Sequence, residues 1–107
     1  MWTPPVDLKE KDGNYLLRVD LPGIKDEDIH VVYKNGFLTI KGNRTKPKDD
    51  GSIQNHMLER YYGRFERVLR MPTGINADSI KKEYKDGILK LTIPVADADK
   101  KKNGAAA

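Results

Sequence analysis

Apolar and polar residues alternate with a period of two along most of this chain. The positions that share an apolar face are Leu17, Val19 and Leu21; Ile29, Val31 and Tyr33; Leu38 and Ile40; and Leu89, Leu91 and Ile93. Side chains two residues apart point to the same side of an extended backbone, so each segment predicts a strand with one buried face. No stretch holds the apolar period of a core helix, and at most one helical turn fits residues 26–28. The pattern predicts an all-β fold.

Pairs of turn-forming residues separate the predicted strands. An Asp or Asn followed by Gly tolerates the positive φ angles of tight turns, and such pairs occur at 12–13, 35–36, 50–51 and 86–87. Residues 29–40 also resemble residues 80–91, and each segment follows a turn that contains Pro and Gly. Any two hairpins of this length look partly alike. Two such hairpins with further strands between them nevertheless suit two facing antiparallel sheets.

Length, charge and composition narrow the possible functions. The 107 residues suit a single domain. Basic residues exceed acidic ones by 20 to 16, but three of the basic residues are Lys100, Lys101 and Lys102 in the tail. The rest of the chain is nearly neutral, whereas a nucleic-acid-binding domain concentrates positive charge on its folded part. No apolar run approaches the roughly 18 residues of a membrane-spanning helix. We therefore expect neither nucleic acid nor a membrane as partner.

The chain lacks the residue patterns of the common catalytic and metal sites. His30 and His56 have no second ligand at helical spacing, and there is no cysteine to bind zinc or form disulfides. Ser52 and Ser79 lie beside turns and outside any nucleophile-elbow pattern, and no Gly-x-Gly phosphate loop is present. We expect no enzymatic activity, no metal and no cofactor. The lack of cysteine and of a secretory pattern favours a cytoplasmic location.

The middle of the chain departs from the alternating pattern. Residues 44–52 are polar and rich in turn formers, and residues 53–62 regain apolar character. A polar excursion with a short strand at its far end predicts an arm. The arm could fold back on its own sheet or reach across to another subunit.

Six short motifs follow one another in a characteristic order. They are PVDLKE at 5–10, DLPGI at 20–24, EDI at 27–29, GFLTIKGNR at 36–44, GRFER at 63–67 and DGILKLTIP at 86–94. Together they resemble the α-crystallin-type domain of small heat shock proteins, in its bacterial and plant form. The resemblance implies an immunoglobulin-like antiparallel β-sandwich that dimerises. It also implies an ATP-independent holdase, a chaperone that binds partly unfolded client proteins and prevents their aggregation.

The resemblance assigns a role to each segment. Residues 5–95 correspond to the domain, 45–60 to its dimerisation arm, 1–4 to a remnant of an N-terminal region and 96–107 to a flexible tail. In the bacterial and plant branch the arm pairs with the first strand of the partner, which implies a strand-exchanged homodimer. Residues 53–60 would be the exchanged strand and residues 6–10 its acceptor. The expected interface residues are Val6, Leu8, Ile53, Met57, Leu58, Glu59, Arg60 and Arg67.

Both ends of the chain depart from the family pattern. The family usually carries a longer apolar N-terminal region, and an Ile-x-Ile or Ile-x-Val motif in its C-terminal tail. Neither pattern is found in this sequence. Because these segments build large assemblies, we expect a homodimer, with higher oligomers only if full-length termini are present.

Two corresponding stripes of the paired hairpins are the expected binding surface. They are Ile29, Val31 and Tyr33 in the first hairpin and Ile80, Lys82 and Tyr84 in the second. A central lysine is too polar for the core but fits a half-exposed edge, where its methylenes cover apolar surface and its ammonium stays in water. In the family these strands are sheet edges, and the tail motif of another dimer lies between them. We expect a peptide-binding groove here, with ordinary core packing as the alternative.

Arg67 is the remaining candidate site residue. It shares an apolar face with Phe65, Leu69 and Met71. A guanidinium buried there needs a carboxylate or carbonyl partner, because removing its water costs several kcal/mol. In the family the matching arginine lies in an ion-pair network near the dimer interface, which is where we expect Arg67. The alternative is a position on a solvated, one-sided sheet.

Two other functions suit an all-β domain of this size. A co-chaperone or adaptor of the CS-domain type shares the sandwich but acts as a monomer on a larger chaperone, and the predicted arm argues against it. A small nucleic-acid-binding barrel needs aromatic residues on one exposed face beside basic ones. Tyr61 and Tyr62 are the candidates, but as neighbours in the chain they point to opposite faces. The holdase is the preferred hypothesis.

Overall fold

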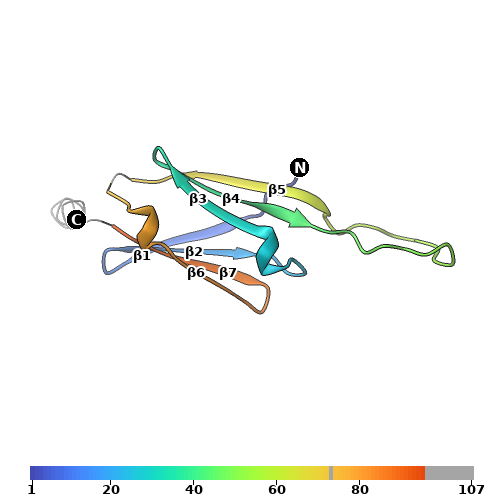
Figure 1. Cartoon of the computed structure of the whole chain (residues 1–107). Helices are drawn as coiled ribbons and strands as arrows, with labels where there is room; N and C mark the ends of the chain where they lie inside the picture. The colour runs from blue at the N-terminus through green and yellow to red at the C-terminus, as the bar shows by residue number, and fades with distance from the viewer. Residues whose placement is uncertain (73, 96–107) are drawn as a thin grey trace.

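Two antiparallel sheets stack on each other in the computed structural model, which describes residues 1–72 and 74–95 (Figure 1). The strands are β1 (Val6–Lys11), β2 (Asn14–Asp20), β3 (Ile29–Lys34), β4 (Phe37–Arg44), β5 (Gly63–Arg70), β6 (Lys81–Lys85) and β7 (Ile88–Pro94). One sheet has the order β1-β2-β7-β6 and the other the order β3-β4-β5. The predicted all-β sandwich is confirmed. The tail expected at 96–107 lies outside the described residues.

Three of the four predicted Asx-Gly turns close hairpins. The φ angles are 52° and 78° at residues 12–13, 53° and 83° at 35–36, and 54° and 76° at 86–87. This left-handed geometry matches the twist of the flanking strands, which explains why β1–β2, β3–β4 and β6–β7 are all hairpins. Residues 50–51 also form a turn, but neither φ is positive and the turn joins no strands. There the Asp50 carboxylate accepts a hydrogen bond from the Ser52 backbone N–H at 2.8 Å.

The sandwich interior contains the residues that the alternation placed on apolar faces. Seven inward side chains of β2, β4 and β7 are each at most 1% exposed, namely Leu17, Val19, Leu38, Ile40, Leu89, Leu91 and Ile93. Phe65 of β5 is equally buried and lies opposite Gly42 of β4. A Cβ on Gly42 would lie 2.7 Å from the Phe65 ring and 2.1 Å from the Asp28 carbonyl oxygen. The glycine therefore makes room for the aromatic ring and for the chain entering β3.

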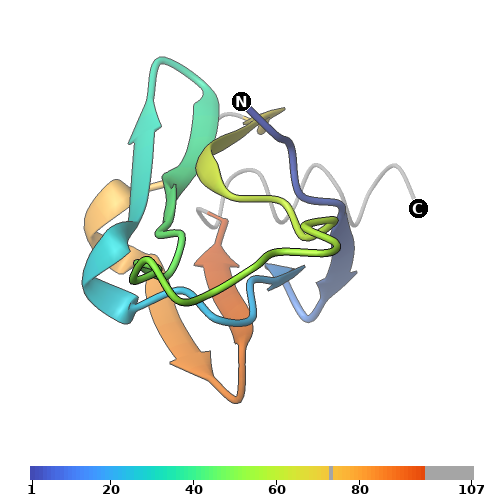
Figure 2. The ribbon, with the colours of Figure 1, turned by 90° about the vertical axis from the view of Figure 1, so that its right-hand side faces the viewer.

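Two short 3₁₀ turns precede the strands at one side of the sandwich. The first, η1 (Asp26–Asp28), is the single helical turn that the sequence predicted. The second, η2 (Ala77–Ser79), was not predicted, although Asn76 caps it by accepting a hydrogen bond from the Asp78 backbone N–H at 3.0 Å. Ile80 follows η2, so β6 begins one residue later than expected. Figure 2 shows β3 and both turns on one side and β1 on the opposite side.

Residues 45–62 leave the sandwich between β4 and β5 as an extended arm. Figure 1 shows the arm, in green and yellow-green, projecting well beyond the ends of the strands. No part of it forms a strand with the sheets of its own chain. The predicted excursion is therefore present, but the short strand expected within it at residues 53–60 does not form in the single chain.

Candidate functional site

A groove of about 370 Å³ runs along the side of the sandwich where β3 and β6 are the edge strands. Its lining residues are Ile29, His30, Val31, Val32, Tyr33, Ala77, Ile80 and Lys82. Five of the six residues predicted for a binding groove are among them. The two stripes thus meet across the gap between the two sheets, as the paired hairpins suggested.

The floor of the groove is apolar but only partly shielded from solvent. Ile29 is 2% exposed and belongs to the core, whereas Val31, Tyr33 and Ile80 are half-buried and pack against the core. The two stripes are therefore neither wholly core nor wholly surface. Because β3 and β6 each have a strand neighbour on one side only, unpaired backbone groups lie beside this apolar floor.

Lys82 is exposed, as expected of a lysine at a sheet edge, and it also makes two polar contacts. Its Nζ donates a hydrogen bond to the Ile29 carbonyl oxygen at 3.0 Å and lies 3.1 Å from Oδ1 of Asp26. These contacts hold the ammonium at the start of β3. The Lys82 side chain, still 34% exposed, bridges the two sheets across one end of the groove.

Tyr84 is the one residue predicted for the groove that is not among its lining residues. Its hydroxyl lies 2.5 Å from the Leu21 carbonyl oxygen and 2.7 Å from the Ile24 carbonyl oxygen. The phenol therefore fastens the loop after β2 to β6. The alternation identified Tyr84 as a half-buried inward residue but gave no information on the loop that covers it.

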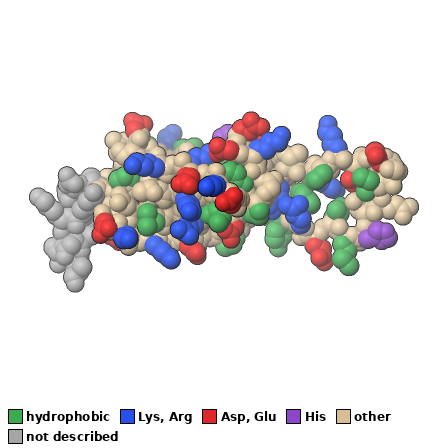
Figure 3. All heavy atoms as spheres, turned by 90° about the horizontal axis from the view of Figure 1, so that it is seen from below, with side chains coloured by type: hydrophobic (Ala, Val, Ile, Leu, Met, Phe, Trp, Pro, Cys, Tyr) green, Lys and Arg blue, Asp and Glu red, His purple; other side chains and the backbone are tan. Residues whose placement is uncertain are grey.

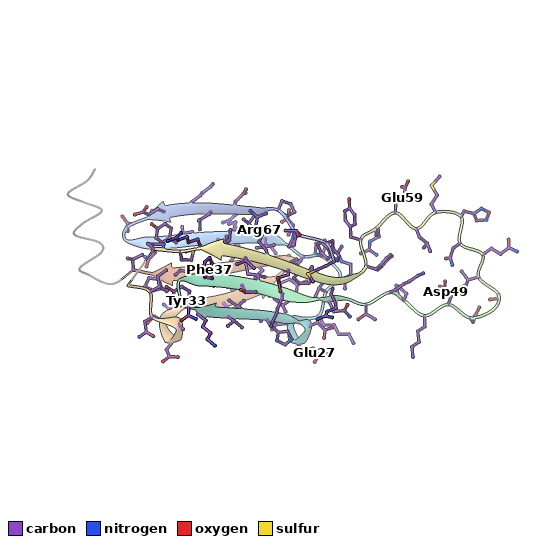
Figure 4. The ribbon with its side chains drawn as sticks, turned by 90° about the horizontal axis from the view of Figure 1, so that it is seen from above. Glu27, Tyr33, Phe37, Asp49, Glu59 and Arg67 are labelled. Carbon is purple, nitrogen blue, oxygen red and sulfur yellow. The ribbon has the colours of Figure 1, made fainter. Side chains whose placement is uncertain are left out.

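The arm exposes most of the apolar side chains that were predicted to form a dimer interface. Ile53 and Leu58 are each 50% exposed and Met57 is 79% exposed, and Glu59 and Arg60 are also exposed. Figure 3 shows hydrophobic side chains distributed over the projecting arm. Within the arm, Asn55 donates a hydrogen bond to Oδ2 of Asp49 at 2.8 Å. In Figure 4, Asp49 and Glu59 lie on the two opposite legs of the arm.

The first strand has an open edge that matches the unpaired arm. β1 pairs only with β2, so its outer edge has no strand neighbour among the described residues. Val6 is half-buried and Leu8 is 42% exposed, although both lie in register with buried residues of β2. The inward face of β1 is therefore incompletely covered by the second sheet.

Arg67 is half-buried on the inward face of β5. In Figure 4 it lies along the side of the sandwich where β1 and β2 run. Among the described residues it forms no ion pair or side-chain hydrogen bond within the chain. Its guanidinium therefore has no ionic partner among the described residues of its own subunit.

The most buried arginine is Arg44, at the base of the arm, which the sequence analysis did not single out. It is 8% exposed, and its Nη1 donates a hydrogen bond to the Tyr61 carbonyl oxygen at 3.1 Å. The guanidinium carbon lies 4.6 Å from the centre of the Trp2 ring, a cation–π contact. Arg44 follows Leu38 and Ile40 on the inward face of β4, so the alternation itself could have identified it.

Trp2 connects the N-terminal segment to the same point. Its backbone N–H donates to the Arg64 carbonyl at 3.1 Å, and its carbonyl accepts from the Glu66 N–H at 3.2 Å. Its ring stacks on Tyr61 with 6.1 Å between ring centres. Burial, with a smaller contribution from the charge of Arg60, lowers the pKa of Arg44 from its ordinary value. Trp2, Arg44 and Tyr61 together fix the direction in which the arm leaves the sandwich.

Replacing Arg44 with methionine is expected to loosen the base of the arm. The change keeps much of the side-chain length but removes the cation over Trp2 and the donor to Tyr61, which together contribute about 1 kcal/mol. Trp2 is the only tryptophan, so its emission spectrum reports on this cluster directly. We expect a shifted emission maximum in R44M and an unchanged one in R64M, because the Arg64 side chain is exposed. An unaltered spectrum in R44M would contradict the proposed role of the cluster.

The described residues contain neither a cluster of metal-binding side chains nor a membrane-spanning helix. No group of three or more His, Asp or Glu side chains in residues 1–72 and 74–95 is placed to hold a metal ion. His30 lies on β3 and His56 on the arm. Within the same residues, no helix has the length and apolar character required to cross a membrane.

Comparison with known proteins identifies a family that matches almost the whole chain. Residues 7–106 match the Hsp20/alpha crystallin family. The chain is 41% identical over 97 residues to small heat shock protein C2 of Rickettsia felis, covering 91% of this chain and 63% of that protein. It is 36% identical over 96 residues to the 16.9 kDa class I heat shock protein 3 of Oryza sativa, covering 89% of this chain and 64% of that protein.

Solved structures show the same fold. Heat shock protein 16.0 from Schizosaccharomyces pombe superposes with a TM-score of 0.81 at 32% identity, covering 89% of this chain and 88% of that one. A small heat-shock protein from Xylella fastidiosa, described as having a distinct high order structure, gives 0.78 at 37% identity, covering 89% and 87%. The chain therefore belongs to the Hsp20/alpha crystallin family of small heat shock proteins, which are generally chaperones and not enzymes. It spans 63% of the length of small heat shock protein C2 and 61% of the length of small heat shock protein C4, both of Rickettsia felis.

Proposed function

We propose that this chain is an ATP-independent holdase that binds partly unfolded proteins and keeps them from aggregating. The observation that carries the proposal is the groove between β3 and β6, where an apolar floor lies beside the open edges of two strands. An extended client segment can place apolar side chains on such a floor and pair its backbone with a strand edge. The chain is 34% charged, which favours solubility of the resulting complex. Binding of this kind needs no catalytic residue.

We further propose that the functional unit is a strand-exchanged homodimer in the cytoplasm. The domain would span residues 5–95, with residues 45–60 as the arm. The exposed apolar side chains of the arm and the open edge of β1 support this arrangement, because each is incomplete within one chain. Arg67 would find its ionic partner across the interface. The monomeric adaptor considered above has no support from the comparisons, since the relatives and structures reported are named heat shock proteins.

The holdase proposal is tested by heating citrate synthase with and without this chain, with no nucleotide added, and following turbidity. We expect the chain to suppress turbidity in proportion to its concentration. An equal mass of bovine serum albumin should leave most of the turbidity that is seen when the enzyme is heated alone. Sizing by light scattering on the same sample establishes the oligomeric state. Full turbidity in the presence of the dimer would contradict the proposed function.

The substitution V31D tests the groove directly. It places a carboxylate on the half-buried floor, so the affinity for a peptide with an Ile-x-Ile motif should fall at least tenfold, because burying an unpaired charge is costly. V68D is the matched control, since Val68 is an exposed valine on β5 and does not line the groove. Isothermal calorimetry measures both affinities, and circular dichroism establishes that both variants are folded. Equal affinities for V31D and the unmodified chain would exclude the groove as the peptide site.

A further inference from the structure

The outer face of the β3-β4-β5 sheet exposes a strip of large apolar side chains. Val32 of β3 is 44% exposed, Phe37 of β4 is 46% exposed and Val68 of β5 is 49% exposed. Apart from Met1, Leu8 of β1 and the residues of the arm, these are the exposed large hydrophobic residues within the described part of the chain. All three come from the same sheet and point away from the sandwich core.

The pairing register makes this strip continuous. Val32 lies opposite Thr39, and Thr39 lies opposite Val68, so the three residues form one row across the sheet. Phe37 is two residues from Thr39 on the same face of β4. Side chains in such positions are in contact range. The outer-face strip is therefore defined by Val32, Phe37, Thr39 and Val68.

Basic side chains flank the outer-face strip at both ends. Lys34 and Arg70 lie on either side of Phe37 in one cross-strand row. Beyond the row of Val32 and Val68, the same face carries Lys41 and Arg64, and the acidic residue among them is Glu66. Hollows of about 270 Å³ and 580 Å³ adjoin the two ends, the first lined in part by Lys41 and Arg64 and the second by Arg70. The face thus combines an apolar centre with a surplus of positive charge around it.

The backbone of this sheet determines what kind of partner fits. β4 is hydrogen-bonded on both sides, to β3 and to β5, so the face offers side chains and no free backbone groups. A partner on this face must satisfy its own backbone hydrogen bonds, as an α-helix does. An extended segment would instead be directed to the sheet edges, where backbone groups are unpaired.

We propose that the outer-face strip docks an amphipathic α-helix whose apolar stripe is flanked by acidic residues. Leucine-like side chains would cover Val32, Phe37 and Val68, and carboxylates would face the flanking cations. A nucleic acid suits the face less well, because the strip is mainly aliphatic and contains one aromatic ring on which a base could stack. Val32 also lines the groove, whereas Phe37, Thr39 and Val68 do not, and the strip is on the other sheet from β1. Most of the site therefore stands apart from the proposed holdase and dimer surfaces.

The test uses a dye-labelled 14-residue peptide with leucine on one helical face and glutamate on both flanks, together with its lysine-for-glutamate counterpart. Fluorescence anisotropy at constant salt should show the acidic peptide binding at least tenfold more tightly than the basic one. The charge reversal K34E/R70E should lower the affinity for the acidic peptide at least tenfold and raise that for the basic one. V32S/V68S should lower the affinity for the acidic peptide about tenfold, because it removes apolar contacts.

Two controls separate this site from the other surfaces. K85E/K90E reverses the same number of charges on the outer face of β6 and β7 and should leave the affinity unchanged. V31D should bind the acidic peptide with unchanged affinity, even if it no longer binds the Ile-x-Ile peptide. The two binding measurements therefore test the groove proposal and the helix-docking proposal separately. Equal binding of the two peptides, or an unchanged affinity in K34E/R70E, would overturn the proposal. It would likewise be overturned if a single-stranded oligonucleotide or an anionic lipid vesicle occupied the face more tightly than the acidic peptide.

Discussion

Replacing Gly42 with valine is expected to prevent the domain from folding stably. The first added carbon would already lie 2.1 Å from the Asp28 carbonyl oxygen and 2.7 Å from the Phe65 ring. Neither neighbour can yield easily, because one is backbone at the entry to β3 and the other is a ring that is 1% exposed in the core. Overpacking a core usually lowers the free energy of unfolding by about 1–3 kcal/mol. A clash with backbone is expected to lower it by about 3 kcal/mol or more. Urea unfolding followed by Trp2 fluorescence measures the loss.

Gly51 provides the matched control for this substitution. No heavy atom lies within 4 Å of a Cβ placed there, and its φ angle is not positive. G51V should therefore unfold within about 0.5 kcal/mol of the unmodified chain, as surface substitutions usually do. If G42V and G51V shared the same unfolding midpoint, the close approach of Phe65 to β4 would not be the constraint inferred from the structure.

The core of the sandwich could be predicted because one physical rule governs it. Leu17 and Val19, like Leu89 and Leu91, alternate with polar residues and therefore lie on one face of their strand. The hydrophobic effect then places that apolar face in the core. Asn35-Gly36 and Asp86-Gly87 fix hairpin turns by local backbone preference alone. Neither inference needs information about residues distant in the chain.

The polar contacts around the groove could not be predicted in the same way, because they are made by the ends of long side chains with residues distant in the sequence. Lys82 was expected at a half-exposed edge, but the alternation gave no sign that its Nζ contacts the carbonyl oxygen of Ile29, a residue 53 positions earlier. The Tyr84 hydroxyl similarly contacts a loop 60 or more positions earlier. A period of two identifies the face on which a side chain lies. It does not identify the polar group at the far end of that side chain.

The two arginines show a related limit. Arg67 was singled out because it interrupts an apolar face, yet it is only half-buried. Arg44 is more buried, and its contacts come from Trp2 and Tyr61, which lie far from it in sequence. Composition likewise predicted an arm from residues 44–62, but it does not show whether the arm folds back on its own sheet or reaches another subunit. The destination of the arm is therefore the feature that most needs a direct test.

Introducing aspartate at the three exposed apolar positions of the arm, I53D/M57D/L58D, is expected to convert the proposed dimer into monomers. Ile53, Met57 and Leu58 are half or more exposed in the single chain, so they gain apolar burial only on association. Burying such side chains contributes about 1.5–3 kcal/mol each, so losing three weakens the dimer by roughly a thousandfold or more. Analytical ultracentrifugation at micromolar concentration should show the mass of two chains for the unmodified protein and of one chain for the variant.

The control variant T45D/Q54D/H56D adds the same number of carboxylates to the arm at polar positions. It should remain a dimer, because it removes no apolar contact and surface charges are screened by salt. Thermal unfolding distinguishes dissociation from misfolding, since the sandwich core does not include the arm and I53D/M57D/L58D should keep a cooperative β-sheet transition. A monomeric unmodified chain, or a dimer that survives all three apolar substitutions, would show that the arm does not join two subunits. The apolar side chains of Ile53, Met57 and Leu58 would then have to be buried against another surface of the same chain.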